Sequence, residues 1–173
     1  MMATMMRAAP LLTIALFCAA CANTSLENNS LQSVQSVASL RAEALSLVNQ
    51  ARSQSGAPPL RLDPTLTAAA QAHAEDMARR GFYGHRSPER GDVAARYRAN
   101  GGGLWFIIGE NISTCLECTA DAGQVRKFQG GWMRSAGHKR NILDPRFDRF
   151  GFGIARTGNK VYAVQTFVRP RDY

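Results

Sequence analysis

The spacing of hydrophobic positions is helical along much of the chain. From residue 40 to residue 51 apolar side chains recur every three or four positions, which is typical of a helix with one buried face. Ser55-Gly56 and Pro58-Pro59 end this pattern. Asp63-Pro64 then supplies an N-cap residue and a proline for the first helical turn, which predicts a second helix that ends at Gly81.

A third helix is expected near residues 122–135, where apolar positions again share one face. The period then changes. Residues 150–156 and 160–168 are rich in β-branched and aromatic residues and flank a Thr-Gly-Asn turn, so they predict a β-hairpin. Helices come first and antiparallel strands last, without a βαβ rhythm, and this order predicts an α+β fold.

The N-terminal residues have the pattern of an export signal. Residues 8–20 are almost wholly apolar and would rise only about 20 Å as a helix, which is too short to span a bilayer. Small residues before Cys21 resemble the lipobox of bacterial lipoproteins, in which the cysteine becomes the lipidated first residue. Cleavage after Ala22 is the alternative. We therefore expect a signal peptide over residues 1–20 and, from its Ser, Asn and Gln content, a polar tether over residues 21–38.

An exported protein is thus predicted, either a periplasmic or outer-surface lipoprotein held at the envelope membrane by its lipid, or a secreted protein. The composition, with 45% hydrophobic and 20% charged residues, is that of a globular domain. The formal charge of +8 suits anionic partners. Its densest cluster, residues 134–149, lacks an array of interleaved aromatic side chains, so it predicts a solvated face and no nucleic-acid partner.

Three short segments combine glycine with titratable groups. His85 follows a helix and precedes Ser-Pro, which predicts a loop. Glu110 lies in Gly-Glu-Asn after an apolar run, so its carboxylate is expected to be partly buried and to need a partner or a shifted pKa. His138 is expected beyond a helix end at Gly137. Three such loops could converge as ligands of a divalent metal or as a hydrogen-bonded polar network. His73, on the apolar face of a helix, is interpreted as a core histidine.

Taken in order, these segments resemble the bacterial branch of the CAP superfamily, which includes cysteine-rich secretory proteins, antigen 5 and pathogenesis-related proteins of class 1 (SCP-like domains). The motifs that carry the resemblance are His73-Ala-Glu-Asp-Met77, Gly84-His85-x-Ser87-Pro88, Gly109-Glu110-Asn111-Ile112, Trp132-Met133-x-Ser135-x-Gly137-His138-x-x-Asn141-Ile142-Leu143, Gly151-x-Gly153 and Gln165-x-Phe167. Each motif is weak alone, but their common order is specific.

The resemblance implies a CAP domain over residues 39–170 with an α-β-α sandwich, in which helices flank a central antiparallel sheet. It also implies a cavity for a ligand or for zinc or another divalent cation. His85 and His138 match the family's two histidines, and Glu110 matches the glutamate between them. Ser135 stands where eukaryotic members have a second acid, and serine is a poorer metal ligand than a carboxylate.

Cys115 and Cys118 form a C-x-x-C pair directly after the Gly-Glu-Asn motif. In an exported protein a local disulfide is the simplest interpretation, and it would close a tight loop beside the cavity. Half of a zinc site and a thioredoxin-like redox pair are the alternatives.

Three classes of function follow from these residues. The resemblance implies a non-enzymatic binding domain for a small or apolar ligand. A hydrolase could instead use Ser135 as nucleophile, His138 as base and Glu110 as orienting acid. A structural envelope protein is the third class. Trp105, Phe128 and Trp132 are expected in the core, with a groove wall for an apolar ligand as the alternative.

Overall fold

The computed structural model describes residues 19–171, with side chains from residue 37 onward. The chain divides into two compact units, residues 1–35 and 36–173. Most of the predicted signal peptide lies outside the described residues, as does the side chain of Cys21. In the described part of the chain, no helix is both long and apolar enough to cross a membrane.

Helix α1, Ala19–Gln54, begins well before the hydrophobic pattern at residue 40. It includes the whole of residues 21–38, the predicted polar tether. The helix ends where the sequence predicts, just before Gly56, whose φ of 74° is a left-handed value that glycine adopts readily.

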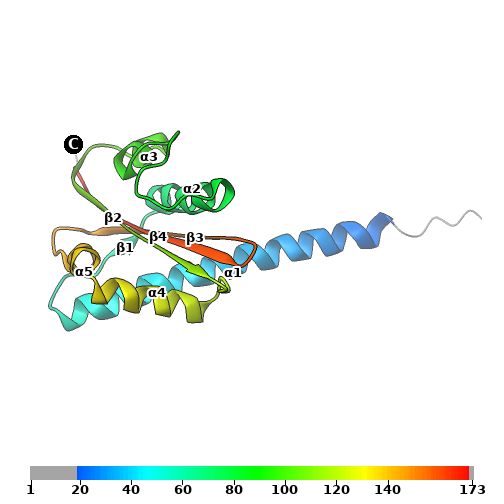
Figure 1. Cartoon of the computed structure of the whole chain (residues 1–173), viewed down its shortest axis with the longest axis horizontal. Coiled ribbons are helices and arrows are strands. Elements are labelled where there is room, and N and C mark those ends of the chain that lie inside the picture. Colours follow the sequence, from blue (N-terminus) through cyan, green and yellow to red (C-terminus); the bar gives the residue numbers. More distant parts are fainter. Residues whose placement is uncertain (1–18, 172–173) are drawn as a thin grey trace, which may run out of the picture. The chain divides into compact units, whose positions relative to one another are not determined.

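The second unit contains a four-stranded sheet in the order β1-β3-β4-β2 (Figure 1). Strand β4 (Lys160–Pro170) lies between two antiparallel partners. These are β2 (Trp105–Leu116) on one side and β3 (Arg149–Thr157) on the other. Strands β3 and β4 form the predicted hairpin, with Gly158 in the turn at φ 55°. The sheet is mixed rather than wholly antiparallel, because the two-residue strand β1, Arg61–Leu62, pairs with β3 in parallel.

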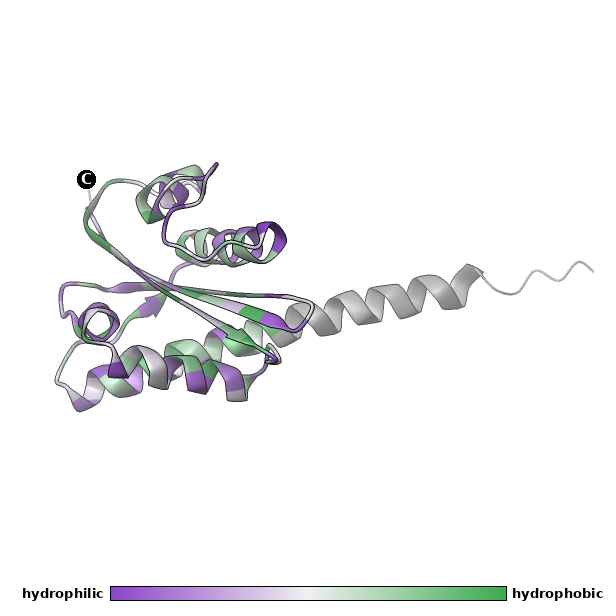
Figure 2. Cartoon of the chain, in the orientation of Figure 1, coloured by the Kyte–Doolittle hydropathy of each residue, from purple (hydrophilic) through white to green (hydrophobic). Residues whose placement is uncertain are grey.

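Helices cover both faces of this sheet (Figure 1). On one side lie α2, Pro64–Arg80, and α3, Val93–Ala99. The other side holds α4, Ala122–Arg134, and α5, Ala136–Leu143, together with the part of α1 that belongs to this unit. Hydrophilic and hydrophobic segments alternate along these helices, as amphipathic helices require (Figure 2). The α+β sandwich predicted from the sequence is confirmed.

Helix α2 has the boundaries that its end residues predict. The Asp63 side chain accepts a hydrogen bond from Leu66 N at 2.8 Å, and Pro64 takes the first turn. Gly81 ends the helix with a left-handed φ of 71°.

The core has a layer on each face of the sheet. One layer joins α1, α4 and α5 to the sheet and contains Phe128 and Trp132, as predicted. The other joins α2 to β2 and β4. Trp105 is half-buried and meets Tyr97 edge-on, with ring centroids 5.9 Å apart. Helix α2 lies so close to β3 that a Cβ on Gly153 would come within 2.3 Å of the Ala70 backbone, which explains the glycine at that position.

Candidate functional site

Glu110 lies within strand β2 and not in a loop, which corrects the sequence-based expectation. The Gly-Glu-Asn segment interrupts an apolar run, and this suggested a break in secondary structure. Its backbone nevertheless continues the ladder with β4, and Glu110 faces Thr166 in the register. Glu110 lies midway along the twelve-residue β2, and the residues on both sides of it pair with β4, so the carboxylate is held from a fixed backbone.

His138 lies in a helix and not beyond a helix end. Helix α4 stops at Arg134, and Ser135 is at once its C-cap and the N-cap of α5. The chain turns there, and His138 belongs to the first turn of α5. His85 does lie in a loop, between α2 and α3, as predicted.

Two hydrogen bonds hold the carboxylate of Glu110. The Nδ1–H of His85 donates to Oε1 at 2.9 Å, and the Nη2–H of Arg96 donates to Oε2 at 2.5 Å. A carboxylate only accepts, so Nδ1 of His85 carries the proton. The side chains of Glu110 and Arg96 are each 2% exposed, whereas that of His85 is 58% exposed. The sequence predicts that this buried carboxylate needs a partner, and the structure gives it two, Arg96 and His85.

Arg96 was not anticipated from the sequence. It comes from α3, a short helix capped by the side chain of Asp92, which accepts from Ala95 N at 2.9 Å. Its Nη1 also donates to the carbonyl oxygens of His85, at 3.0 Å, and Gly91, at 2.6 Å. One guanidinium thus joins the strand that carries Glu110 to the loop that carries His85. Burial of Glu110 signalled that a partner was needed, but nothing local distinguished Arg96 from the chain's other arginines.

The His85 loop is also fastened to α2. Ser87 donates from Oγ to Asp76 Oδ2 at 2.7 Å, and both side chains are buried. Arg79 donates to the other oxygen of Asp76 at 2.8 Å. A backbone bridge between Ser87 and Gly91 closes the loop. These contacts fix the backbone that follows His85.

His73 is the core histidine that the sequence predicts. It is fully buried, and its Nε2–H donates to the carbonyl oxygen of Gly84 at 3.0 Å. Its Nδ1 has no hydrogen-bond partner. Burial lowers the pKa of His73, an effect that nearby Glu110 opposes and Arg96 reinforces. The imidazole is therefore held neutral behind the Glu110 carboxylate, with Nε2 at 4.0 Å from Oε1.

His138 lies near enough to His85 for the two rings to interact electrostatically. Burial lowers the pKa of His138, and the neighbouring His85 lowers it further. Asparagines of the two motifs hold α5 against β2. Asn141 donates to the Glu110 carbonyl at 3.1 Å and to Asn111 Oδ1 at 2.9 Å, while Asn111 donates to the His138 carbonyl at 3.2 Å. The packing of α5 on β2 therefore brings His138 to the site.

Ser135 lies one turn before His138 on α5, and its hydroxyl makes no capping hydrogen bond. Within residues 37–171, no hydrogen bond joins Ser135 Oγ to the His138 ring. The acid of the site pairs with His85 and not with His138. The nucleophile, base and acid of the hydrolase hypothesis are thus not joined in one chain of hydrogen bonds.

The donor set for a metal is short. Among residues whose side chains are described, no group of three or more His, Cys, Asp or Glu could hold an ion. Both Glu110 oxygens accept hydrogen bonds from protein groups. The imidazoles of His85 and His138 are then the side chains that can offer a nitrogen lone pair to a metal. Zinc sites have three or four protein ligands, so an ion held by the two imidazoles would need water ligands to complete its coordination. Metal ligation by His85, His138 and Glu110 stays a prediction.

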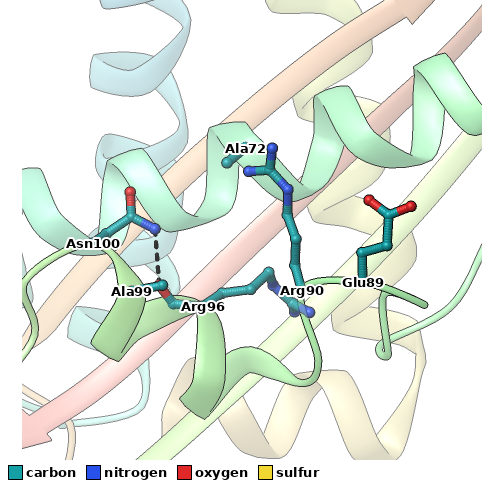
Figure 3. Close-up of a pocket in the computed structure, with 6 residues that line it drawn as sticks. All are labelled: Ala72, Glu89, Arg90, Arg96, Ala99 and Asn100. Atoms are coloured by element: carbon teal, nitrogen blue, oxygen red, sulfur yellow. Dashed lines mark hydrogen bonds between the residues drawn. The ribbon is translucent and has the colours of Figure 1, made fainter.

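A cavity of about 350 Å³ lies between α2 and α3. Its lining includes Arg90, Asn100 and the stem of Arg96 (Figure 3). Asn100 donates from Nδ2 to the Arg96 carbonyl oxygen at 2.8 Å. Arg96 therefore both lines this cavity and holds Glu110.

Cys115 and Cys118 form the predicted disulfide. It lies at the end of β2 beside the hairpin turn, where Cys118 N donates to Asn159 O at 3.2 Å. Cys115 is five residues further along the strand than Glu110, which corresponds to about 17 Å. The bridge is therefore not beside the site, contrary to the sequence-based expectation.

Residues 45–168 match the CAP family, described as the Cysteine-rich secretory protein family. The chain belongs to the CAP family. This match covers most of the chain and contains every site residue discussed above, so the resemblance inferred from the motifs is confirmed.

The protein is similar to two curated proteins of Bacillus subtilis. It is 29% identical to the uncharacterized protein YkwD over 132 residues, which cover 76% of this chain and 49% of YkwD. It is 27% identical over 127 residues to the uncharacterized membrane protein YlbC, with 73% of this chain and 34% of YlbC covered. The chain thus spans half or less of the length of these relatives.

Among solved structures, it is similar to an extracellular protein containing an SCP domain from Bacillus anthracis. The identity is 27%, the TM-score is 0.63, and the match covers 76% of this chain and 40% of that one.

Proposed function

We propose that this CAP-domain protein is exported and acts by binding, not by catalysis, and that a small ligand or a divalent cation binds between His85 and His138. The observation that carries the proposal is the double hydrogen bonding of Glu110 by Arg96 and His85. It fixes the His85 ring with Nδ1 turned inward, so Nε2 is the ring atom left for a ligand.

The chemistry of two such imidazoles favours binding of a polar group. A neutral His85 with its proton on Nδ1 presents a lone pair on Nε2. His138, kept neutral by its lowered pKa, offers one donor and one acceptor. A ligand hydroxyl can both donate and accept, and a divalent cation with water ligands can use the lone pairs. The carboxylate behind His85 orients its ring, as carboxylates do for metal-bound histidines.

Export is supported by the N-terminal sequence and by the similar proteins. The Bacillus anthracis protein is described as extracellular, and YlbC as a membrane protein. We further propose that Cys21 is lipidated and anchors the protein at the envelope membrane. A Cys21→Ala variant should then be found in the soluble envelope or medium fraction, whereas the unaltered protein sediments with membranes.

Binding at the histidine pair is tested with Zn²⁺ as the probe on the purified full-length protein. Isothermal titration of the unaltered protein is compared with a His85→Ala/His138→Ala variant and with His73→Gln. Because His73 is fully buried, its variant is a matched control and should bind as the unaltered protein does. Small molecules that co-purify with each protein are compared by native mass spectrometry.

Zinc binding that is lost only in the double variant would support a cation as the ligand. A co-purified molecule lost only in the double variant would support a small organic ligand. If the unaltered protein and the double variant bind zinc alike and carry the same molecules, the binding role of this site is wrong.

A further inference from the structure

Arginines gather at the end of the sheet where β2 begins and β4 ends. Asp148 Oδ2 lies 3.7 Å from Arg61, 3.8 Å from Arg149 and 3.5 Å from Arg169. These arginines come from β1, β3 and β4, which the register places side by side. One carboxylate therefore faces three guanidinium groups.

Exposed hydrophobic side chains adjoin this cluster. Phe106 is 68% exposed and Leu104 is 49% exposed. The guanidinium of Arg171 lies over the Phe106 ring, 5.5 Å from its centroid, and Arg171 N donates to the Leu104 carbonyl at 2.9 Å. Phe106 and Arg169 also line one open cavity of about 420 Å³ together with Arg146.

We propose that this arginine face, made of Arg61, Arg146, Arg149, Arg169 and Arg171 around Phe106, docks the domain on a membrane surface that contains anionic phospholipid. The proposal goes beyond ligand binding at His85 and does not depend on it. In the described part of the chain, two carboxylates form ion pairs with these five arginines. Asp148 lies near Arg61, Arg149 and Arg169, and Asp144 pairs with Arg146. The face therefore keeps an excess of positive charge.

The mixture of side chains favours a bilayer over other polyanions. Exposed phenylalanine and leucine gain free energy when they enter the acyl boundary of a bilayer, and the arginines beside them can remain at the phosphate level. A nucleic acid or a cell-wall polymer would use the arginines and leave Phe106 and Leu104 in water. Basic residues near an anionic membrane each strengthen binding by roughly a factor of five.

The test is flotation of the full-length protein with vesicles of phosphatidylcholine alone and with vesicles that also contain phosphatidylglycerol. Every variant has the same N-terminal segment, so differences among variants report on the face. Replacing Arg146, Arg169 and Arg171 by Gln should lower the binding gained from phosphatidylglycerol by on the order of 100-fold. Phe106→Ser should also lower it, and hydrogen exchange should slow around residues 104–107 only when phosphatidylglycerol is present.

Matched controls use residues that are not part of the arginine face. Leu116 is 64% exposed at the opposite end of β2, so Leu116→Ser makes the same kind of change as Phe106→Ser. A second triple variant, Arg134→Gln/Arg140→Gln/Arg156→Gln, removes the same net charge from other exposed positions. Both controls should bind as the unaltered protein does. The proposal would be overturned if the two triple variants lost binding equally or if Phe106→Ser bound as the unaltered protein does. It would also be overturned if soluble polyglutamate competed for the protein as strongly as phosphatidylglycerol vesicles do.

Discussion

Arg96 and Glu110 form a buried ion pair at the centre of the site, with Nη2 of the arginine 2.5 Å from Oε2 of the glutamate. The two residues come from different elements, α3 and β2. A buried charge without its partner is strongly unfavourable, so each side chain requires the other. The pair also sets the orientation of His85, because the other carboxylate oxygen of Glu110, Oε1, accepts a hydrogen bond from Nδ1–H of His85.

Loss of the guanidinium should destabilise the fold. We expect Arg96→Met to lower the free energy of unfolding by about 3–5 kcal/mol, because it leaves a buried, uncompensated carboxylate. Urea denaturation measures the change. The double variant Arg96→Met/Glu110→Gln should be destabilised by less than the sum of the changes in Arg96→Met and Glu110→Gln, because it leaves no buried charge without a partner. Additive losses would show that the two charges do not stabilise each other.

Acid should destabilise the protein through His73. Its pKa is lowered in the folded state by burial, so the unfolded chain binds a proton more readily than the folded one. Stability should therefore fall as the pH drops below the unfolded value of about 6.5 and continue to fall until the lowered folded pKa is reached. The midpoint of urea unfolding at several pH values measures this.

The His73→Gln variant isolates that effect. Glutamine can still donate to the Gly84 carbonyl but does not titrate, so the variant should lose less stability on acidification than the unaltered protein. His138→Gln should reduce the acid sensitivity less, because His138 is only partly buried. If stability depended on pH in His73→Gln as it does in the unaltered protein, His73 would not be the source of the acid sensitivity.

A methyl group at Gly153 should push α2 away from β3. The added Cβ would lie 2.3 Å from the backbone of Ala70, and neither backbone can move without disturbing the core. Gly153→Ala should therefore destabilise the protein by at least about 1–3 kcal/mol. Gly131, in helix α4, has no atom within 4 Å of its added Cβ. Gly131→Ala is the control and should stabilise by about 0.5–1 kcal/mol.

The disulfide should contribute modestly to stability and nothing to the site. A loop of this size gains about 2 kcal/mol from closure in the chain-entropy treatment. Cys115→Ser/Cys118→Ser should lose about that much in thermal or urea unfolding and keep the zinc response of the unaltered protein, because the bridge lies about 17 Å along the strand from Glu110. Thiol labelling of the unaltered protein before and after reduction verifies the bond. A variant that loses the zinc response would place the disulfide in the site.

The sequence by itself determined what depends on neighbours along the chain. Asp63 and Gly81 predict both ends of α2, because a cap acts through hydrogen bonds within a few residues. The turn at Gly158 predicts the hairpin for the same reason. The order of the motifs was sufficient to indicate the CAP family, and hence to bring His85, Glu110 and His138 together as candidates.

Tertiary structure decided what depends on residues far apart in the chain. Glu110 is part of a strand because β4 pairs with it, although Gly-Glu-Asn is locally a poor strand sequence. Arg96 is the partner of Glu110 because α3 packs over β2, a contact between elements that no periodic pattern encodes. The same packing makes Glu110 the group that holds His85, since a buried carboxylate takes whichever donors the fold brings to it.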